Sequence, residues 1–240
     1  MHALILGGTR EARDLAPLLL ERGWRVTSSL AGRVRDPALP AGEVRIGGFG
    51  GPQGLADWIA RHCVDVIVDA THPFAERISA SAAAAAGETP LIALHRPAWQ
   101  AEDEWTMVAS MEDAAAACGE SGRRIFLTIG RQNLHVFADS GNDFLIRCVE
   151  QPVEPLPERR LILLSRGPFT VEGEITLMRE HRIDALVTKN SGGTLTAAKL
   201  EAARELGVEV IMIERPGLPE VDLVVHSAEE ALNRCCSAVR

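Results

Sequence analysis

Short apolar runs alternate with amphipathic segments along this chain, and the alternation predicts strands separated by helices. Residues 3–6 form an apolar run that is too short for a helix and that ends at two glycines. Residues 10–22 then place leucines at helical spacing before Gly23. We expect further strands at residues 25–30, 44–46, 66–68 and 91–94, and further helices at residues 55–62 and 74–86. This order is typical of a parallel sheet with right-handed βαβ connections.

The second half of the sequence repeats the pattern. It predicts strands at residues 125–129, 144–149, 161–164, 185–187 and 210–213, and a helix at residues 195–206. His62 and Asp65 recur 119 residues later as His181 and Asp184, and Arg96-Pro97 recurs at 215–216 with the same offset. Residues 110–114 and 227–231 also resemble each other. We therefore expect a duplicated α/β chain of two Rossmann-like parallel-sheet domains, residues 1–120 and 121–240, with a cleft between them.

Composition excludes several classes of protein. A net charge of −8 argues against a general nucleic-acid binder, which needs a basic face. No apolar run approaches the ~20 residues that span a bilayer, and the first residues lack the features of a signal peptide. The chain has no tyrosine, which rules out the Tyr-Lys pair of short-chain dehydrogenases. The five cysteines show neither C-x-x-C pairs nor zinc spacing. We expect a cytoplasmic monomer or small homo-oligomer with no metal, nucleic acid or membrane as partner.

The turn after the first strand has the context of a phosphate-binding loop. It follows a strand and opens a helix, where glycines let backbone N–H groups approach a diphosphate and the helix dipole favours negative charge. Its spacing departs from G-x-G-x-x-G, so a plain tight turn remains an alternative. The candidate cofactor-binding residues of this turn are Gly7, Gly8, Thr9, Arg10, Glu11 and Ala12.

The end of the second strand indicates which cofactor binds. A unit that binds NAD usually carries an acidic residue there, which contacts the ribose hydroxyl. Residues 28–33 contain no acid, whereas Ser28, Ser29 and Arg33 suit a 2′-phosphate, so NADPH is favoured over NADH. Arg33 as a solvated surface residue is the alternative. The glycine-rich segment after the third strand adds three candidates for the adenosine side, Gly47, Gly48 and Phe49.

The segment after the fourth strand lies where a nicotinamide ring is expected. Thr71 and His72 are placed to contact a ligand there, and His72 is a candidate proton donor. Pro73 fits the first turn of the following helix, and Thr71 as a helix cap is an alternative.

Basic residues follow successive strands of the second half. Arg131, Arg166 and Lys189 form a positive rim on an acidic protein, which suits a substrate with several carboxylates or phosphates. Residues 190–193 add polar donors and glycines at an expected helix N-terminus. The candidate substrate-binding residues are Arg131, Arg166, Lys189, Asn190, Ser191, Gly192 and Gly193, and the candidate catalytic residues are Thr71, His72 and Lys189.

Five segments together resemble the precorrin-6A reductase (cobalt-precorrin-6A reductase) family of cobalamin (vitamin B12) biosynthesis. They are Gly-Gly-Thr-x-Glu-Ala-Arg (7–13), Ile-Gly-Gly-Phe-Gly-Gly (46–51), Asp-Ala-Thr-His-Pro-Phe-Ala (69–75), Thr-Lys-Asn-Ser-Gly-Gly (188–193) and Lys-Leu-Glu-Ala-Ala (199–203). The resemblance covers nearly the whole chain, and the combination of motifs is more specific than any one of them.

The resemblance implies an NADPH-dependent oxidoreductase that delivers hydride to a ring double bond of precorrin-6A, giving precorrin-6B. The substrate would be an anionic tetrapyrrole-derived macrocycle, whose acetate and propionate arms the basic rim would bind. Two alternatives remain: a non-redox Rossmann-like transferase acting on a similar acidic molecule, and a nucleotide sensor without enzymatic activity.

Overall fold

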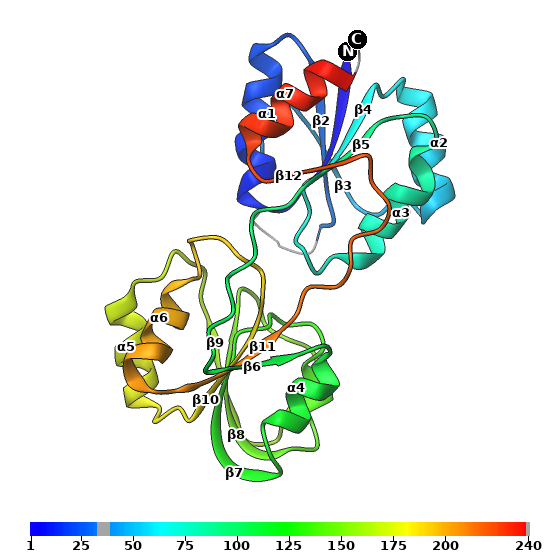
Figure 1. Cartoon of the computed structure of the whole chain (residues 1–240). Coiled ribbons are helices and arrows are strands. Elements are labelled where there is room, and N and C mark those ends of the chain that lie inside the picture. Colours follow the sequence, from blue (N-terminus) through cyan, green and yellow to red (C-terminus); the bar gives the residue numbers. More distant parts are fainter. Residues whose placement is uncertain (33–38, 239–240) are drawn as a thin grey trace. The chain divides into compact units, whose positions relative to one another are not determined.

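The chain folds into two compact units in the computed structural model, which describes residues 1–32 and 39–238 (Figure 1). The first unit comprises Met1–Pro97 and Pro216–Arg240, and the second comprises Ala98–Arg215. Among the described residues, no helix is both long and apolar enough to cross a membrane.

The first unit contains one parallel sheet of six strands in the order β12-β5-β4-β1-β2-β3. The strands are β1 (His2–Leu6), β2 (Arg25–Leu30), β3 (Glu43–Ile46), β4 (Val66–Asp69), β5 (Leu91–Leu94) and β12 (Leu223–Val225). The helices are α1 (Arg10–Glu21), α2 (Pro52–His62), α3 (Glu76–Ala86) and α7 (Ala228–Ala238). Strands β2 and β3 are added on one side of β1, and β4, β5 and β12 on the other, so the strand order switches between β1 and β4 as in dinucleotide-binding folds.

The second unit has the same topology, with the strand order β6-β11-β10-β7-β8-β9. Its strands are β6 (Trp105–Val108), β7 (Ser121–Leu127), β8 (Gly141–Cys148), β9 (Arg160–Leu164), β10 (Ala185–Lys189) and β11 (Glu209–Ile213). Its helices are α4 (Met111–Ala117), the 3₁₀ helix η1 (Leu134–Phe137), α5 (Val171–Glu180) and α6 (Ala198–Leu206).

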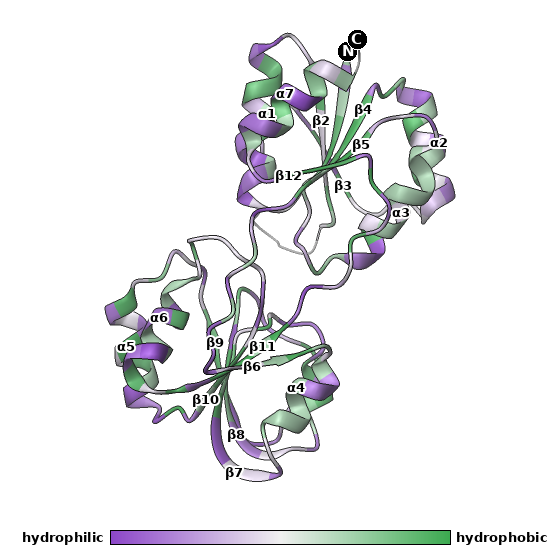
Figure 2. Cartoon of the chain, in the orientation of Figure 1, coloured by the Kyte–Doolittle hydropathy of each residue, from purple (hydrophilic) through white to green (hydrophobic). Residues whose placement is uncertain are grey.

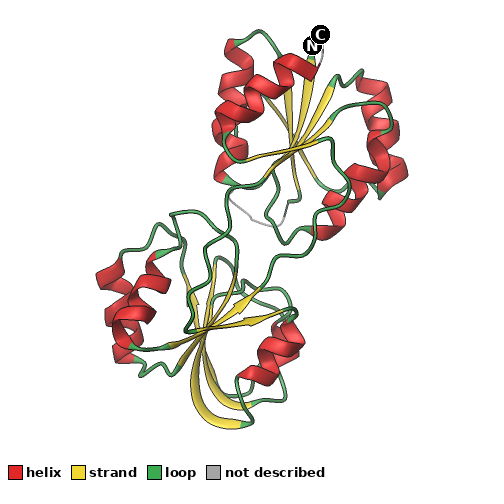
Figure 3. Cartoon of the chain, viewed as in Figure 1, coloured by secondary structure: helices red, strands yellow, loops and turns green. Residues whose placement is uncertain are grey.

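Each sheet is covered by helices on both faces, which explains why its central strands read as continuous apolar runs (Figure 3). All five residues of β1 are buried. On one face, Ala3 and Ile5 pack with α1 and α7, and on the other Leu4 and Leu6 pack against α2 and α3. Figure 2 shows apolar residues concentrated in the strands of both units. The prediction of an α/β chain with two Rossmann-like parallel sheets is confirmed.

The two units exchange their last strand and helix. In sequence, β6 and α4 close the first half, yet β6 pairs with β11 of the second unit. Likewise β12 closes the second half and pairs with β5 of the first unit. The chain passes from one unit to the other after Pro97 and again before Pro216, so the repeated Arg-Pro dipeptides mark both passages.

The expected boundary after residue 120 therefore differs from the compact units. The sequence repeat does end near that point, but the pairing of β6 and β12 places residues 98–120 in the second unit and residues 216–240 in the first. Two helices also begin later than expected. The helix expected from residue 74 begins at Glu76 and the one expected from residue 195 begins at Ala198, because turns precede both.

Candidate functional site

Four loops of the first unit lie side by side at the carboxyl edge of its sheet. Because β4, β1, β2 and β3 are consecutive neighbours, the segments that follow them share this edge. The fold thus brings together most of the expected cofactor-binding residues: Gly7 to Ala12, Ser29, Gly47 to Phe49 and Thr71 to Pro73. Arg33, also expected there, lies outside the described residues.

The turn after β1 is held in place by Thr9. Its hydroxyl accepts a hydrogen bond from the Ala12 amide (3.2 Å), which caps α1, and donates one to the carbonyl of Ala70 (2.8 Å). Glu11 forms an ion pair with Arg96 at 3.0 Å, whereas Arg10 pairs with Asp14 on the exposed face of the helix. Thr9 thus fixes the turn after β1 against the loop after β4.

The glycines of this edge leave room for a ligand. A Cβ at Gly8 would meet no atom within 4 Å, and the same is true at Gly47. Both residues have positive φ, 127° and 115°, which favours glycine. Gly8 therefore borders open space beside the start of α1, where the helix dipole favours anions. These residues fit a dinucleotide with its diphosphate at the first turn.

Arg45, a residue that sequence reasoning missed, organises the end of β3. Its guanidinium donates hydrogen bonds to the Ser29 hydroxyl (2.7 Å) and to the carbonyls of Gly47 (2.9 Å) and Gly48 (3.1 Å). It also lies over the ring of Phe49, 3.7 Å from the centroid. Partial burial lowers the pKa of Arg45 from its ordinary value, and the group stays cationic.

A positive group therefore stands at the end of β2 and β3, where an NAD-binding unit would carry an acid. Ser29 contacts this group directly. Ser28 instead is buried within β2, and its hydroxyl has no hydrogen-bond partner among the described residues. In the sequence, the clue that could have identified Arg45 as a site residue is its position two residues before a glycine-rich segment.

The loop after β4 is ordered by its own polar groups. Asp69 accepts hydrogen bonds from the amide (3.1 Å) and the hydroxyl (2.7 Å) of Thr71. This contact replaces the helix-capping role considered for Thr71, since α3 has no side-chain cap. His72 is exposed, and its Nδ1 accepts a hydrogen bond from the Phe74 amide (3.3 Å). The neutral ring then carries its proton on Nε2. Pro73 lies in the turn before α3 and not in its first turn.

The expected substrate-binding residues share the carboxyl edge of the second unit's sheet. They follow β10, β7 and β9; β10 and β7 are neighbours in that sheet, and β8 separates β7 from β9. Arg131 forms an ion pair with Glu150 at 3.0 Å, Arg166 is exposed, and Lys189 is half-buried at the end of β10.

Asn190 has a structural role that the sequence did not indicate. Its side chain accepts a hydrogen bond from the Trp99 amide (2.8 Å) and donates one to the Trp99 carbonyl (3.1 Å). The Trp99 indole in turn donates to the carbonyl of Gly193 (3.0 Å). Gly192 and Gly193 have positive φ values of 66° and 81°. The loop with Ser191 precedes a turn and not directly a helix N-terminus, because α6 begins at Ala198.

A buried charged cluster, also missed by sequence reasoning, lies within the second unit. Arg147 and Glu174 form a buried two-point ion pair, and the Arg147 guanidinium lies 3.8 Å from the ring centroid of Phe169. Lys199 is buried beside them, with its amine 5.3 Å from the centroid of Trp99. The pKa of Lys199 is lowered to about 7, first by burial and second by the Arg147 charge, while Glu174 opposes the shift. The sequence clue to this cluster was an arginine within the otherwise apolar residues 144–148.

The described residues contain no group of three or more His, Cys, Asp or Glu side chains that could hold a metal ion.

Comparison with known proteins gives one consistent family. Residues 2–236 match the family model described as precorrin-6x reductase CbiJ/CobK. A precorrin-6A reductase of Rhodococcus erythropolis is 54% identical over 95% of both chains, and a cobalt-precorrin-6A reductase of Priestia megaterium is 34% identical over 99% of both. A solved structure described as CobK precorrin-6A reductase superposes with a TM-score of 0.91 at 40% identity, covering 99% of this chain and 97% of the other. The chain belongs to the precorrin-6x reductase CbiJ/CobK family.

Proposed function

We propose that this chain is an NADPH-dependent reductase that transfers a hydride to a ring double bond of precorrin-6A, giving precorrin-6B in cobalamin biosynthesis. The observation that carries the proposal is the edge of the first sheet. It combines a dinucleotide-binding strand order, an open glycine turn before α1 and a cationic Arg45 where an NAD-binding unit has an acid. The family supports the reductase activity and the substrate class.

The proposal assigns a role to each residue at the carboxyl edge of the first sheet. Gly8 and Thr9 would hold the diphosphate in a turn that the Gly7 amide fixes by donating to the Ser29 carbonyl (2.9 Å). Ser29 and Arg45 would bind the 2′-phosphate, with Arg33 as a further candidate. NADPH held there would supply a hydride, with its two electrons, to one ring carbon of the macrocycle. The balancing proton goes to the neighbouring ring atom, and His72 is its proposed donor, acting as the imidazolium with Nδ1 released from the Phe74 amide.

The second unit binds the anionic macrocycle in this proposal. Arg131, Arg166 and Lys189 face its carboxylate arms, and Trp99 is held near them by Asn190. A conjugated ring is itself an electrophile, so the protein's task is orientation and charge stabilisation.

The metal-free substrate is favoured over the cobalt complex. Relatives described as precorrin-6A reductases are 44–54% identical to this chain, whereas relatives described as cobalt-precorrin-6A reductases are 25–34% identical. Incubation with each substrate under the same conditions measures this preference directly.

The test is anaerobic incubation with precorrin-6A and NADPH, followed by absorbance at about 340 nm together with the macrocycle spectrum. The proposal expects one NADPH consumed for each macrocycle reduced. NADPH binding without consumption would favour a nucleotide sensor, and macrocycle conversion without consumption would favour a non-redox transferase.

A further inference from the structure

A hollow lies at the amino-terminal edge of the second unit's sheet, opposite the edge that carries Arg131, Arg166 and Lys189. It has a volume of about 590 Å³ and lies among the beginnings of β8 and β9, β7 and the turn that follows α5. This volume falls within the range of small-molecule sites. Four arginines line it, Arg124, Arg159, Arg160 and Arg182, against two carboxylates, Asp143 and Glu180.

Two of the four guanidinium groups already have partners. Arg159 forms an ion pair with Asp143 at 3.3 Å, and Arg160 binds Glu154 and the Pro157 carbonyl, both at 2.7 Å. The side chains of Arg124 and Arg182 make no hydrogen bond or ion pair among the described residues. Glu180 is the remaining carboxylate of the lining, so the hollow keeps positive charge on a chain whose net charge is −8.

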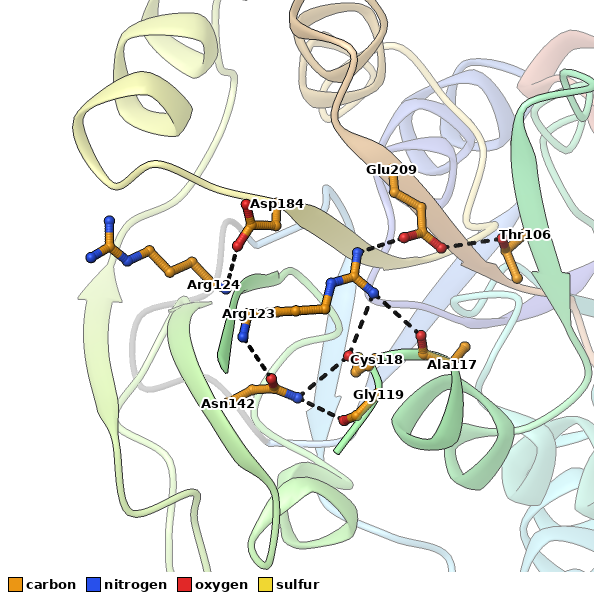
Figure 4. A network of polar contacts seen from close by, with 9 residues as sticks. All are labelled: Thr106, Ala117, Cys118, Gly119, Arg123, Arg124, Asn142, Asp184 and Glu209. Carbon is orange, nitrogen blue, oxygen red and sulfur yellow. Dashed lines mark hydrogen bonds and ion pairs between the residues drawn. The ribbon is translucent and has the colours of Figure 1, made fainter. Parts of the chain in front are cut away.

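The walls of the hollow are fixed by backbone hydrogen bonds. The Arg124 amide donates to the Asp184 carboxylate (2.8 Å), and the Asp184 amide donates to the Arg124 carbonyl (2.8 Å). On the opposite side of the hollow, the Phe144 amide of β8 donates to the carbonyl of Arg159 (2.9 Å), the residue before β9. Figure 4 shows the Arg124 side chain pointing away from the network that holds its backbone. The guanidinium is thus presented by a rigid base, which lowers the entropic cost of binding.

At the equivalent position in the first unit, the amino-terminal edge of its sheet, side chains of the protein bind one another. There, His2 and Asp65 exchange the equivalent pair of hydrogen bonds, at 2.7 and 2.9 Å, so His2 occupies the place of Arg124. The His2 ring is buried between the His62 carbonyl and the Thr27 hydroxyl, each at 2.9 Å. Trp58 stacks on His62 with ring centroids 4.0 Å apart.

The polar groups at this position in the first unit therefore satisfy one another. The second unit keeps His181 and Asp184 in place of His62 and Asp65, but it has Arg124 in place of His2 and Arg182 in place of Cys63. Cys63 and Arg182 occupy the same turn, each with a φ of 49°, so the backbone is shared and the side chains alone differ. If this part of the second unit only stabilised the fold, the hydrogen-bonded arrangement seen in the first unit would be sufficient. The second unit instead carries two guanidinium groups that make no hydrogen bond or ion pair within the described part of the chain.

We propose that this hollow is a second ligand site that binds a small polyanion carrying at least two phosphate or carboxylate groups. Arg124 and Arg182 each offer a planar pair of donors that matches one such group. The proposal stands independently of the reductase activity, because the hollow lies at the opposite edge of its sheet from the expected substrate-binding residues.

The test compares calorimetric titrations of inorganic pyrophosphate and of citrate into the full-length protein saturated with NADP⁺. The phosphate and carboxylate arms distinguish the two kinds of anion. The variant is Arg124→Gln with Arg182→Gln, and the matched control is Arg179→Gln with Arg234→Gln, two exposed arginines that do not line the hollow.

We expect wild type and control to bind one anion at this site and the variant to bind it about tenfold or more weakly, because two charge-assisted contacts are lost. NADPH affinity, measured by cofactor fluorescence, stays the same in all three proteins. The proposal is overturned if neither anion binds the wild type beyond the cofactor site, or if control and variant lose affinity equally.

Discussion

At the strand ends, the partners that single side chains bind cannot be inferred from residue type. Asn190 and Thr71 are expected to contact ligands. In the structure the side chain of Asn190 also binds the backbone of Trp99, and that of Thr71 also binds Asp69. Arg45 was not expected in the site, yet it contacts Ser29 and stacks on Phe49. Residue type identified the polar positions, but the partners of each group depend on neighbours distant in sequence.

Replacing Arg45 by Gln should weaken NADPH binding about tenfold and change NADH binding little, because a charge-assisted contact to the 2′-phosphate is lost. Fluorescence titration with both cofactors measures the preference. Arg25→Gln is the matched control, since Arg25 pairs with Glu43 on the exposed surface at the opposite end of β2. An equal loss for both cofactors would mean that Arg45 only supports the loop.

Replacing Lys199 by Met should stabilise the protein more at neutral than at alkaline pH. The folded state lowers the pKa of Lys199 to about 7, so the wild type loses stability as pH falls from the ordinary lysine pKa toward 7. The difference in unfolding free energy between variant and wild type should therefore grow by up to roughly 3 kcal/mol from about pH 9.5 to about pH 7. Urea denaturation across this range measures it, and a difference independent of pH would contradict a depressed pKa.

At the scale of elements, the apolar periodicity located most strands of the described residues but missed β6 and β12, and it located the helix beginnings less well. The helices expected from residues 74 and 195 begin at 76 and 198, because Pro73 and the segment 195–197 adopt turns. The helix α2 instead begins earlier than expected, at Pro52, since proline suits a first helical turn. Strand burial follows local sequence, whereas helix ends depend on what the preceding loop contacts.

Gly54 tests this dependence on loop contacts. A Cβ at this position would lie 1.8 Å from the Phe49 carbonyl oxygen. Alanine normally favours a helix over glycine by about 1 kcal/mol, but here the clash should dominate and lower the unfolding free energy by roughly 2–4 kcal/mol. Gly217→Ala is the control, because a Cβ there meets no atom within 4 Å. Chemical denaturation compares the two, and equal stability would show that the loop yields without cost.

At the scale of the whole molecule, two repeats in the sequence become two units that exchange their ends. The apolar residues of α7, among them Ala231, Leu232 and Cys235, are buried in the core of the first unit. The half-chain 121–240, cut at the sequence repeat, thus lacks β6, the sixth strand of its sheet. It also carries α7 without the core of the first unit, in which α7 is buried.

The fragment 98–215 should therefore fold alone, whereas the fragment 121–240 should not. The first contains all six strands of its sheet, and the second lacks β6 and carries β12 without β5. Far-ultraviolet circular dichroism during heating should show a cooperative transition for 98–215 and none for 121–240. A cooperative transition of similar midpoint in both fragments would contradict the importance of the exchange.

The sequence by itself determined the alternation of strands and helices, the internal repeat, the family and the strand ends that carry polar residues. These are local properties, since side-chain periodicity and glycine turns act over a few residues. Tertiary structure alone decided which sheet receives β6 and β12, which groups Arg45 and Asn190 contact, and that Lys199 is buried with a lowered pKa. Each of these depends on residues brought together from distant parts of the chain, and pairing and burial at that distance are fixed only when the sheets assemble.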